Sequence, residues 1–117
     1  MEKSKIFIIA EKDLARNIAA IIDQLIPHIE LFEIYDYKET LKFLYNNYFV
    51  TLIMTEFFYK KLIVSLGATD IKKTIVITDN DKFIEECEKE EIKTVKRDNL
   101  EIGFKNLLGG KKPKEKK

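Results

Sequence analysis

The sequence predicts an α/β fold in which helices cover both faces of a doubly wound, five-stranded parallel sheet. Strand-length apolar runs alternate with longer stretches of helical spacing, and this pair recurs five times. Some of these runs are apolar throughout, as expected of strands that are buried on both faces. Only a few residues separate consecutive elements, which favours parallel strands joined by right-handed helical crossovers.

The first two strands are predicted at residues 6–9 and 29–35, with one helix between them. The apolar residues of that helix recur at helical spacing: Leu14, Ile18, Ile21, Ile22 and Leu25. Pro27 marks its end.

A second helix and a third strand follow. Asp36, with Glu39 three residues later, has the spacing of a capping box. The apolar stripe of this helix consists of Leu41, Leu44, Tyr45 and Tyr48. The third strand is predicted at residues 49–54 and ends next to Thr55.

The third helix is marked by Phe58, Leu62 and Leu66. Gly67 fits its C-terminal cap, and the fourth strand is predicted at residues 74–78. The fourth helix has candidate caps in Asp79, Asn80 and Asp81 and a stripe in Phe83, Ile84 and Cys87.

The fifth strand is short, at residues 93–95, and one more helix completes the pattern. Asp98 with Glu101 repeats the capping-box spacing. The stripe of this last helix is Leu100, Phe104, Leu107 and Leu108, and the helix is expected to end at Gly109.

The 117 residues make one domain of ordinary size, predicted at residues 1–109, followed by a disordered Lys-rich tail at residues 110–117. The tail carries five Lys and one Glu, so the net charge of +1 leaves −3 on the domain. Affinity for duplex DNA comes from neutralising phosphates. An acidic domain therefore argues against a nucleic-acid partner.

No apolar run approaches the roughly 18 residues of a membrane span, and the segment before the first strand offers no signal-peptide core. We expect a cytoplasmic protein with no membrane partner. The single cysteine excludes an internal disulfide, and Cys87 is predicted as a core residue. His28 is expected to be a solvated loop residue.

Polar residues follow the strands where a doubly wound sheet binds ligands, beyond the carboxyl ends and near the switch in strand order. Glu11 follows the first strand, Thr55 and Glu56 follow the third, Thr78 ends the fourth, and Lys96 follows the fifth. The topology predicts that these five side chains share one edge of the sheet.

In these segments the chain resembles the receiver domain of bacterial response regulators, from about Lys5 to Gly109. Residues 5–11 resemble the receiver's first strand and the acidic position after it. Residues 74–78 are similar to the fourth strand, which ends in a phosphate-sensing Thr, and residues 94–100 resemble the fifth strand with its Lys. The resemblance implies a flavodoxin-like (βα)5 topology with strand order 2-1-3-4-5.

The departures from the receiver pattern fall on its chemistry. Thr55 stands where the family has its phosphorylated Asp, and a Thr without an adjacent base is no acceptor for a phosphohistidine. Ala10 replaces one acidic residue, so any metal would rest on Glu11 alone, and we expect none, and no cofactor. Glu56 is one residue out of register and would point to the other face of a regular strand. Arg97 and Lys93 replace the usual Pro and the switching aromatic.

Scaffold roles explain the same residues equally well. Thr55 could cap the third helix, and Glu11 with Asp13 could favour the positive end of the first helix. Thr78 could be an ordinary β-branched strand residue. Lys96 could pair with Glu11.

The resemblance implies a receiver-like signalling domain that is not phosphorylated and acts by binding another protein of a regulatory complex, or a second copy of itself. Receivers use the face made by the fourth helix, fifth strand and fifth helix, which the resemblance places at residues 87–108. The expected face residues are Cys87, Lys93, Val95, Arg97 and Phe104.

Two other resemblances remain open. Residues 8–13 and 76–81 also resemble the motifs of Toprim nucleotidyl-transfer enzymes, in which Glu11, Asp79 and Asp81 would hold the Mg²⁺. Against this, Lys12 replaces the usual Gly. Residues 50–56 are similar to the middle strand of a small stalk subunit of vacuolar and archaeal ATPases, which usually has only four strands.

Overall fold

The computed structural model describes residues 5–46 and 51–109. The predicted Lys-rich tail at residues 110–117 lies outside the described residues. So do Tyr48 of the predicted second stripe and the first two residues of the predicted third strand, Phe49 and Val50.

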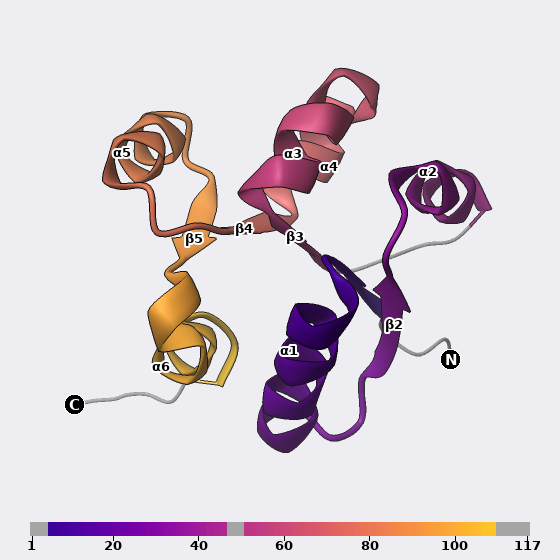
Figure 1. Ribbon diagram of the computed structural model, residues 1–117, viewed down its shortest axis with the longest axis vertical. Helices are drawn as coiled ribbons and strands as arrows, with labels where there is room; N and C mark the ends of the chain where they lie inside the picture. Colours follow the sequence, from indigo (N-terminus) through magenta and orange to yellow (C-terminus); the bar gives the residue numbers. More distant parts are fainter. Residues whose placement is uncertain (1–4, 47–50, 110–117) are drawn as a thin grey trace.

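The predicted alternation of strands and helices is confirmed, and the sheet is parallel throughout (Figure 1). The strand order is β2-β1-β3-β4-β5, which is the order expected of a flavodoxin-like sheet. The strands are β1 (Lys5–Ile9), β2 (Glu30–Ile34), β3 (Thr51–Thr55), β4 (Thr74–Ile77) and β5 (Lys93–Val95). The helices are α1 (Lys12–Leu25), α2 (Tyr37–Asn46), α3 (Glu56–Leu62), α4 (Ala68–Lys72), α5 (Asp81–Lys89) and α6 (Leu100–Phe104).

Helices cover both faces of the sheet, as Figure 1 shows, with α1 and α6 on one side and α2, α3, α4 and α5 on the other. Successive residues of a strand point to opposite faces. Accordingly Ile6 and Ile8 of β1 pack with the α1 and α6 residues, whereas Phe7 and Ile9 pack with those of α3 and α5. The central strands are therefore apolar on both faces because each face has its own hydrophobic layer.

The segment after α3 differs from the prediction, because a further short helix, α4, precedes β4. A 3₁₀ turn at Ile63–Ser65 continues α3, and Leu66 then leaves helical geometry at φ −97° and ψ 137°. Gly67 has φ −79° and its carbonyl accepts from the Ile71 N–H, so it begins α4. The prediction that Gly67 caps the end of the third helix is wrong, because buried Leu66 already turns the chain back toward the core.

The helix caps agree with the sequence in part. The Asn80 side chain accepts from the N–H groups of Lys82 and Phe83, as predicted for the start of this helix. The Asp36 carboxylate accepts from the Lys38 N–H at 2.9 Å, which is the second helical position and not the third that a capping box uses.

The predicted capping box at Asp98 is wrong. Residues Arg97–Asn99 form a 3₁₀ turn, and α6 begins after Asn99, whose side chain makes no capping hydrogen bond. Asp98 is therefore inside the turn and does not cap the last helix. After α6, a π-helical turn at Lys105–Gly109 carries the chain to the predicted end.

The last helix packs closely on the fifth strand at Gly103. A Cβ atom at this position would lie 2.6 Å from Cγ1 of Val95, which is closer than packed carbon atoms approach. The glycine therefore sets the distance between α6 and β5.

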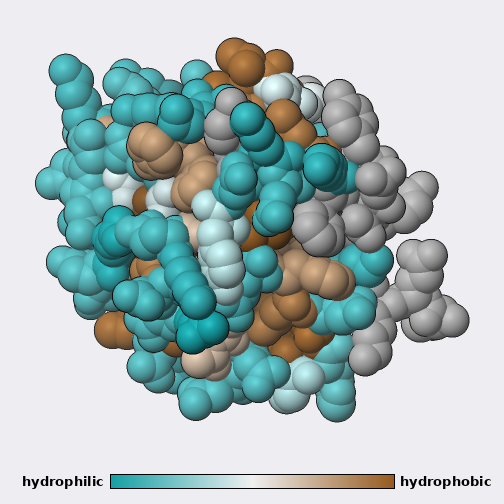
Figure 2. Space-filling view, turned by 45° about the vertical axis from the view of Figure 1, so that its right-hand side comes forward, coloured by the Kyte–Doolittle hydropathy of each residue, from teal (hydrophilic) through white to brown (hydrophobic). Residues whose placement is uncertain are grey.

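On the side shown in Figure 2, hydrophilic residues cover most of the surface and hydrophobic residues gather in smaller areas between them. Among the helices that the structure describes, none combines the length and the apolar character needed to cross a membrane.

Candidate functional site

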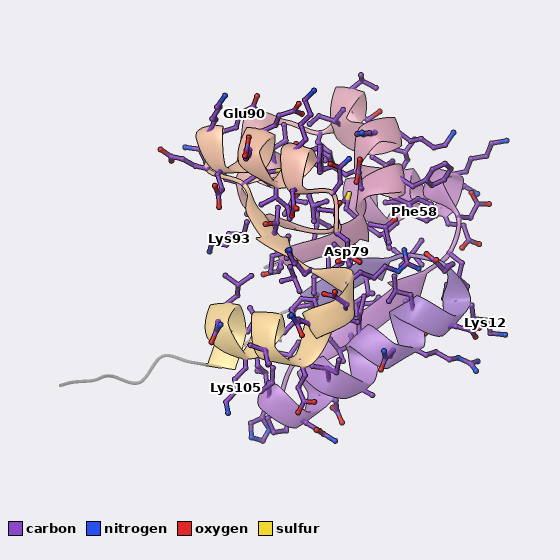
Figure 3. The ribbon with its side chains drawn as sticks, turned by 60° about the vertical axis from the view of Figure 1, so that its left-hand side comes forward. Lys12, Phe58, Asp79, Glu90, Lys93 and Lys105 are labelled. Atoms are coloured by element: carbon purple, nitrogen blue, oxygen red, sulfur yellow. The ribbon has the colours of Figure 1, made fainter. Side chains whose placement is uncertain are left out.

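A cleft of about 820 Å³ lies at the carboxyl edge of the sheet. Residues that follow each of the five strands contribute to its lining, among them Glu11, Tyr35, Thr55, Glu56, Thr78 and Arg97. Asp79 and Phe58 also line the cleft. Figure 3 labels both residues, and they lie on the side of the molecule away from Lys93, the first residue of β5. The strand order reverses between β1 and β3, so the cleft occupies the ligand position of a doubly wound fold.

Thr55 ends β3 and is 4% exposed. Its hydroxyl oxygen accepts from the Phe58 N–H at 3.4 Å, and its backbone is extended, as for an N-cap residue. The interpretation of Thr55 as the cap of α3 is therefore confirmed. Thr55 also belongs to the lining of the cleft.

Glu56 lies in the cleft, contrary to the expectation that it would point to the other face. The strand ends at Thr55, so the alternation of strand side chains no longer applies to Glu56, which is the first residue of α3. One carboxylate oxygen, Oε1, accepts from the Thr78 hydroxyl at 2.6 Å. The other, Oε2, pairs with the Lys60 Nζ at 2.7 Å, one helical turn later.

The surroundings of Glu56 favour its charged form. The hydrogen bond from Lys60 is the main cause that lowers the pKa of this carboxyl below its usual value, and the hydrogen bond from Thr78 adds to it. The Lys60 ammonium has its pKa raised by the same contact. Glu56 is therefore held as a carboxylate whose two oxygens both have donors from this chain.

Thr78 does more than an ordinary strand residue. It is buried, it donates to Glu56, and its oxygen accepts from the Asn80 N–H at 3.0 Å. It therefore connects the start of α3 with the turn that leads into α5. This hydroxyl lies where the sequence predicted it, but its partner is a carboxylate of the chain.

Glu11 is paired with Arg97 and not with Lys96. The Arg97 Nη2 donates to Glu11 Oε2 at 2.6 Å, and this bond is the main cause that lowers the pKa of the Glu11 carboxyl. Lys96 is not among the residues that line the cleft, and its Nζ lies 3.3 Å from Asp81 Oδ1. Val95 packs with the α1 and α6 layer. Lys96 follows the end of β5 and reaches Asp81 at the start of α5, whereas Arg97, in the 3₁₀ turn that comes next, reaches Glu11.

Asp79, in the loop after β4, caps backbone N–H groups in the turn after β5. Its Oδ1 accepts from the N–H of Arg97 at 2.7 Å and from that of Asp98 at 3.4 Å. The expectation that Asp79 would cap the following helix is wrong, because Asn80 does so and Asp79 instead holds the turn after β5.

The three carboxylates of the Toprim alternative are not brought together. Glu11 binds Arg97, Asp79 binds backbone N–H groups, and Asp81 pairs with Lys96. In the described part of the chain, no three His, Cys, Asp or Glu side chains are grouped so that they could hold a metal ion. The stalk-subunit alternative likewise gains no support, since the sheet has five strands.

The expected interaction face needs correction, because Cys87, Val95 and Phe104 are buried with exposed fractions of 3%, 2% and 0%. They pack between helices and sheet and cannot contact a partner. Burial also raises the pKa of the Cys87 thiol, which agrees with a core role. Lys93 and Arg97 are exposed, although Arg97 is turned toward Glu11.

Three exposed apolar residues in the cleft or on the expected interaction face were not predicted from the sequence. Tyr35 and Phe57 line the cleft, and Ile102 lies on α6, 62% exposed. Tyr35 follows the last residue of β2, Phe57 is the second residue of α3, and Ile102 lies on α6 away from its apolar stripe. Phe57 and Ile102 lie off the predicted apolar stripes of their helices, so helical periodicity could have found these two, whereas Tyr35 fell inside the strand predicted at residues 29–35.

No protein-family model, curated protein or solved structure matches this chain.

Proposed function

We propose that the chain is a receiver-like signalling domain that is not phosphorylated and acts by binding another protein. The observation that carries the proposal is the state of the cleft at the carboxyl edge. Its hydroxyls and carboxylates occupy the places where a receiver would hold a metal ion and a phosphoryl group. Their hydrogen-bonding capacity is largely taken up by Lys60, Arg97 and backbone N–H groups of the same chain.

The acceptor position argues against phosphorylation. Thr55 is buried and caps α3, and no histidine or carboxylate is bonded to its hydroxyl among the described residues. A hydroxyl without a base is a weak nucleophile. Glu56 is ionised, but its two oxygens already accept from Thr78 and Lys60. Attack by either side chain would require these contacts to break.

The proposed partner surface is the exposed side of α5, β5 and α6. Lys93 is exposed at the start of β5, and Ile102 exposes most of its side chain on α6. An exposed aliphatic side chain surrounded by charged residues has the composition of a protein contact, with an apolar centre and a polar rim. The partner is either another component of a regulatory complex or a second copy of the chain. We place this activity in the cytoplasm, in keeping with a single buried thiol.

The phosphorylation claim is tested by incubating the protein with Mg²⁺ and acetyl phosphate and measuring its intact mass. A phosphorylatable receiver domain in the same reaction is the positive control. We expect the mass to stay unchanged. A gain of one phosphoryl group, mapped to Thr55 or Glu56, would contradict the proposal.

The surface claim is tested by sedimentation of the wild type and of Ile102→Arg over a wide range of protein concentration. If a second copy is the partner, the wild type should dimerise and Ile102→Arg should remain monomeric. Val64→Arg is the matched control, because Val64 is 89% exposed but lies on the turn after α3. Dimerisation that both variants retain would exclude this surface from the dimer.

A further inference from the structure

The cleft at the carboxyl edge has features that internal ion pairing does not explain. The structure gives four large apolar side chains as exposed within the described residues, and two of them, Tyr35 and Phe57, line this cleft. They come from different elements, Tyr35 after β2 and Phe57 at the start of α3. Exposed aromatic rings that line one concave site are typical of a binding surface.

Both rings are held in position. The Tyr35 hydroxyl donates to Glu33 Oε1 at 2.8 Å. The Phe57 ring packs edge-on against Phe58, with ring centroids 5.5 Å apart, and the Lys61 Nζ lies 5.0 Å from its centroid. A ring that is already ordered loses little conformational freedom when a ligand binds.

Thr55 adds a polar feature that points to a ligand. Its oxygen accepts from the Phe58 N–H, and no acceptor for its O–H is found in the described part of the chain, although the residue is 4% exposed and belongs to the cleft lining. A donor in this position can bond to an oxygen atom from outside the chain, either that of water or that of a ligand which displaces it. Thr78, by contrast, uses its hydroxyl both to donate and to accept.

The charges of the cleft favour an uncharged ligand. Its two basic side chains are already bound to carboxylates, Arg97 to Glu11 and Lys60 to Glu56. Asp79 carries one further negative charge and bonds to backbone N–H groups. An anion would have to compete with these carboxylates, and a cation would compete with the Arg97 and Lys60 side chains that they already bind. The cleft volume of about 820 Å³ lies within the range of small-molecule sites.

We propose that this cleft binds an uncharged aromatic molecule with a carbonyl group next to its ring, such as an aromatic amide. The ring would contact Tyr35 and Phe57 at the mouth, and the carbonyl oxygen would accept from the Thr55 hydroxyl on the floor. The inference goes beyond the proposed function, since it assigns a small-molecule site that is independent of any protein partner.

The test uses benzamide as the probe, with amide chemical shifts of the full ¹⁵N-labelled chain as the measurement. We expect saturable shifts centred on Tyr35, Thr55 and Phe57, with millimolar affinity as befits a small fragment. Benzoate tests the charge requirement and cyclohexanecarboxamide the ring requirement, and both should bind more weakly. Absence of shifts up to the solubility limit, shifts elsewhere, or tighter binding of benzoate would overturn the proposal.

Variants then identify the contacts. Phe57→Ala should weaken benzamide binding about three- to tenfold, since it removes an aromatic contact from an exposed position. Ile102→Ala, which removes an equally exposed side chain outside the cleft, should leave it unchanged. Equal benzamide affinity of Phe57→Ala and the wild type would overturn the proposal that the ligand ring contacts Phe57 at the mouth of the cleft.

Thr55→Val removes the hydroxyl and should weaken binding about fivefold, whereas Thr55→Ser keeps the hydroxyl and should retain wild-type affinity. Because Thr55 also caps α3, chemical denaturation of both variants shows whether the fold is retained. If N-acetyltyrosinamide shifts the same amides while benzamide does not, the cleft accepts a partner's side chain and the small-molecule proposal fails.

Discussion

The two faces of the sheet and its carboxyl edge are built from different materials. Each face is a layer of fully buried aliphatic and aromatic residues, such as Ile8 with Ile53 on one side and Phe7 with Met54 on the other. The edge adds hydroxyls and charged groups, bonded in short chains such as Lys60–Glu56–Thr78, to a few exposed aromatic rings. Burial of the residues on the two faces stabilises the fold, whereas the hydrogen bonds and ion pairs at the edge fix the positions of the side chains in the cleft.

This difference separates stability from function in the molecule. Burying a large apolar side chain contributes about 1.5–3 kcal/mol, whereas a half-exposed ion pair contributes about 1 kcal/mol or less. Substitutions at the edge should therefore change what the cleft can bind more than they change folding. Substitutions in the faces should do the opposite.

The largest effect is expected for Phe104→Ala. Phe104 is fully buried between α6 and the sheet, so its loss leaves a cavity and should lower the free energy of unfolding by about 3–5 kcal/mol. Urea denaturation followed by circular dichroism measures it. Ile102→Ala, two residues earlier on the exposed side, is the matched control and should change stability by less than about 0.5 kcal/mol. Similar losses in both variants would contradict the layer assignment.

Thr78→Val should cost less, about 1–2 kcal/mol, although the residue is equally buried. Valine fills the same volume, but it removes the donor to Glu56 and the acceptor for the Asn80 N–H. Thr78→Ser keeps both hydrogen bonds and loses only a methyl group. If the Ser variant is the less stable of the two in the same denaturation experiment, Thr78 acts by packing and the hydrogen bonds are secondary.

A smaller effect, a gain in the free energy of unfolding, is expected in the turn between α5 and β5. Glu91 has φ 62°, a left-handed backbone that a side chain disfavours, in the turn where the Ile92 N–H donates to the Cys87 carbonyl at 2.8 Å. Such a position after a helix is usually Gly. Glu91→Gly should raise the free energy of unfolding by about 0.5–1 kcal/mol. Glu90→Gly, with φ −99°, should be destabilising in the same measurement.

The smallest effect is a pH dependence from Glu56. Its pKa is lowered in the folded protein, chiefly by the hydrogen bond from Lys60, so its contribution to stability is present above the usual value of 4.5. This contribution is lost as the pH falls through the lowered pKa. Glu56→Gln should therefore lose less stability than the wild type as the pH falls below 4.5, with pH-dependent urea denaturation as the measurement.

Glu11 shares this direction, because Arg97 lowers its pKa as well. Glu11→Gln is thus a matched variant on a more exposed ion pair, where solvent screening reduces the contribution. A larger acid effect in Glu11→Gln than in Glu56→Gln would reverse the ranking of the two pairs.

The sequence by itself determined the fold class and the five strands, because strand and helix periodicity are local properties that burial on two faces imposes on the residues. It also determined that Glu11, Thr55 and Thr78 line one cleft, because parallel strands must end at a common edge.

Only the tertiary structure decided which partners these residues take. Whether Arg97 or Lys96 reaches Glu11 depends on where β5 ends and how the next turn rotates the chain, and Asp79 fixes that turn from another loop. Glu56 lies in the cleft because it is the first residue of α3, whereas the prediction treated it as a further residue of the strand. Such choices depend on contacts between segments far apart in the chain, and no local pattern of residue types encodes them.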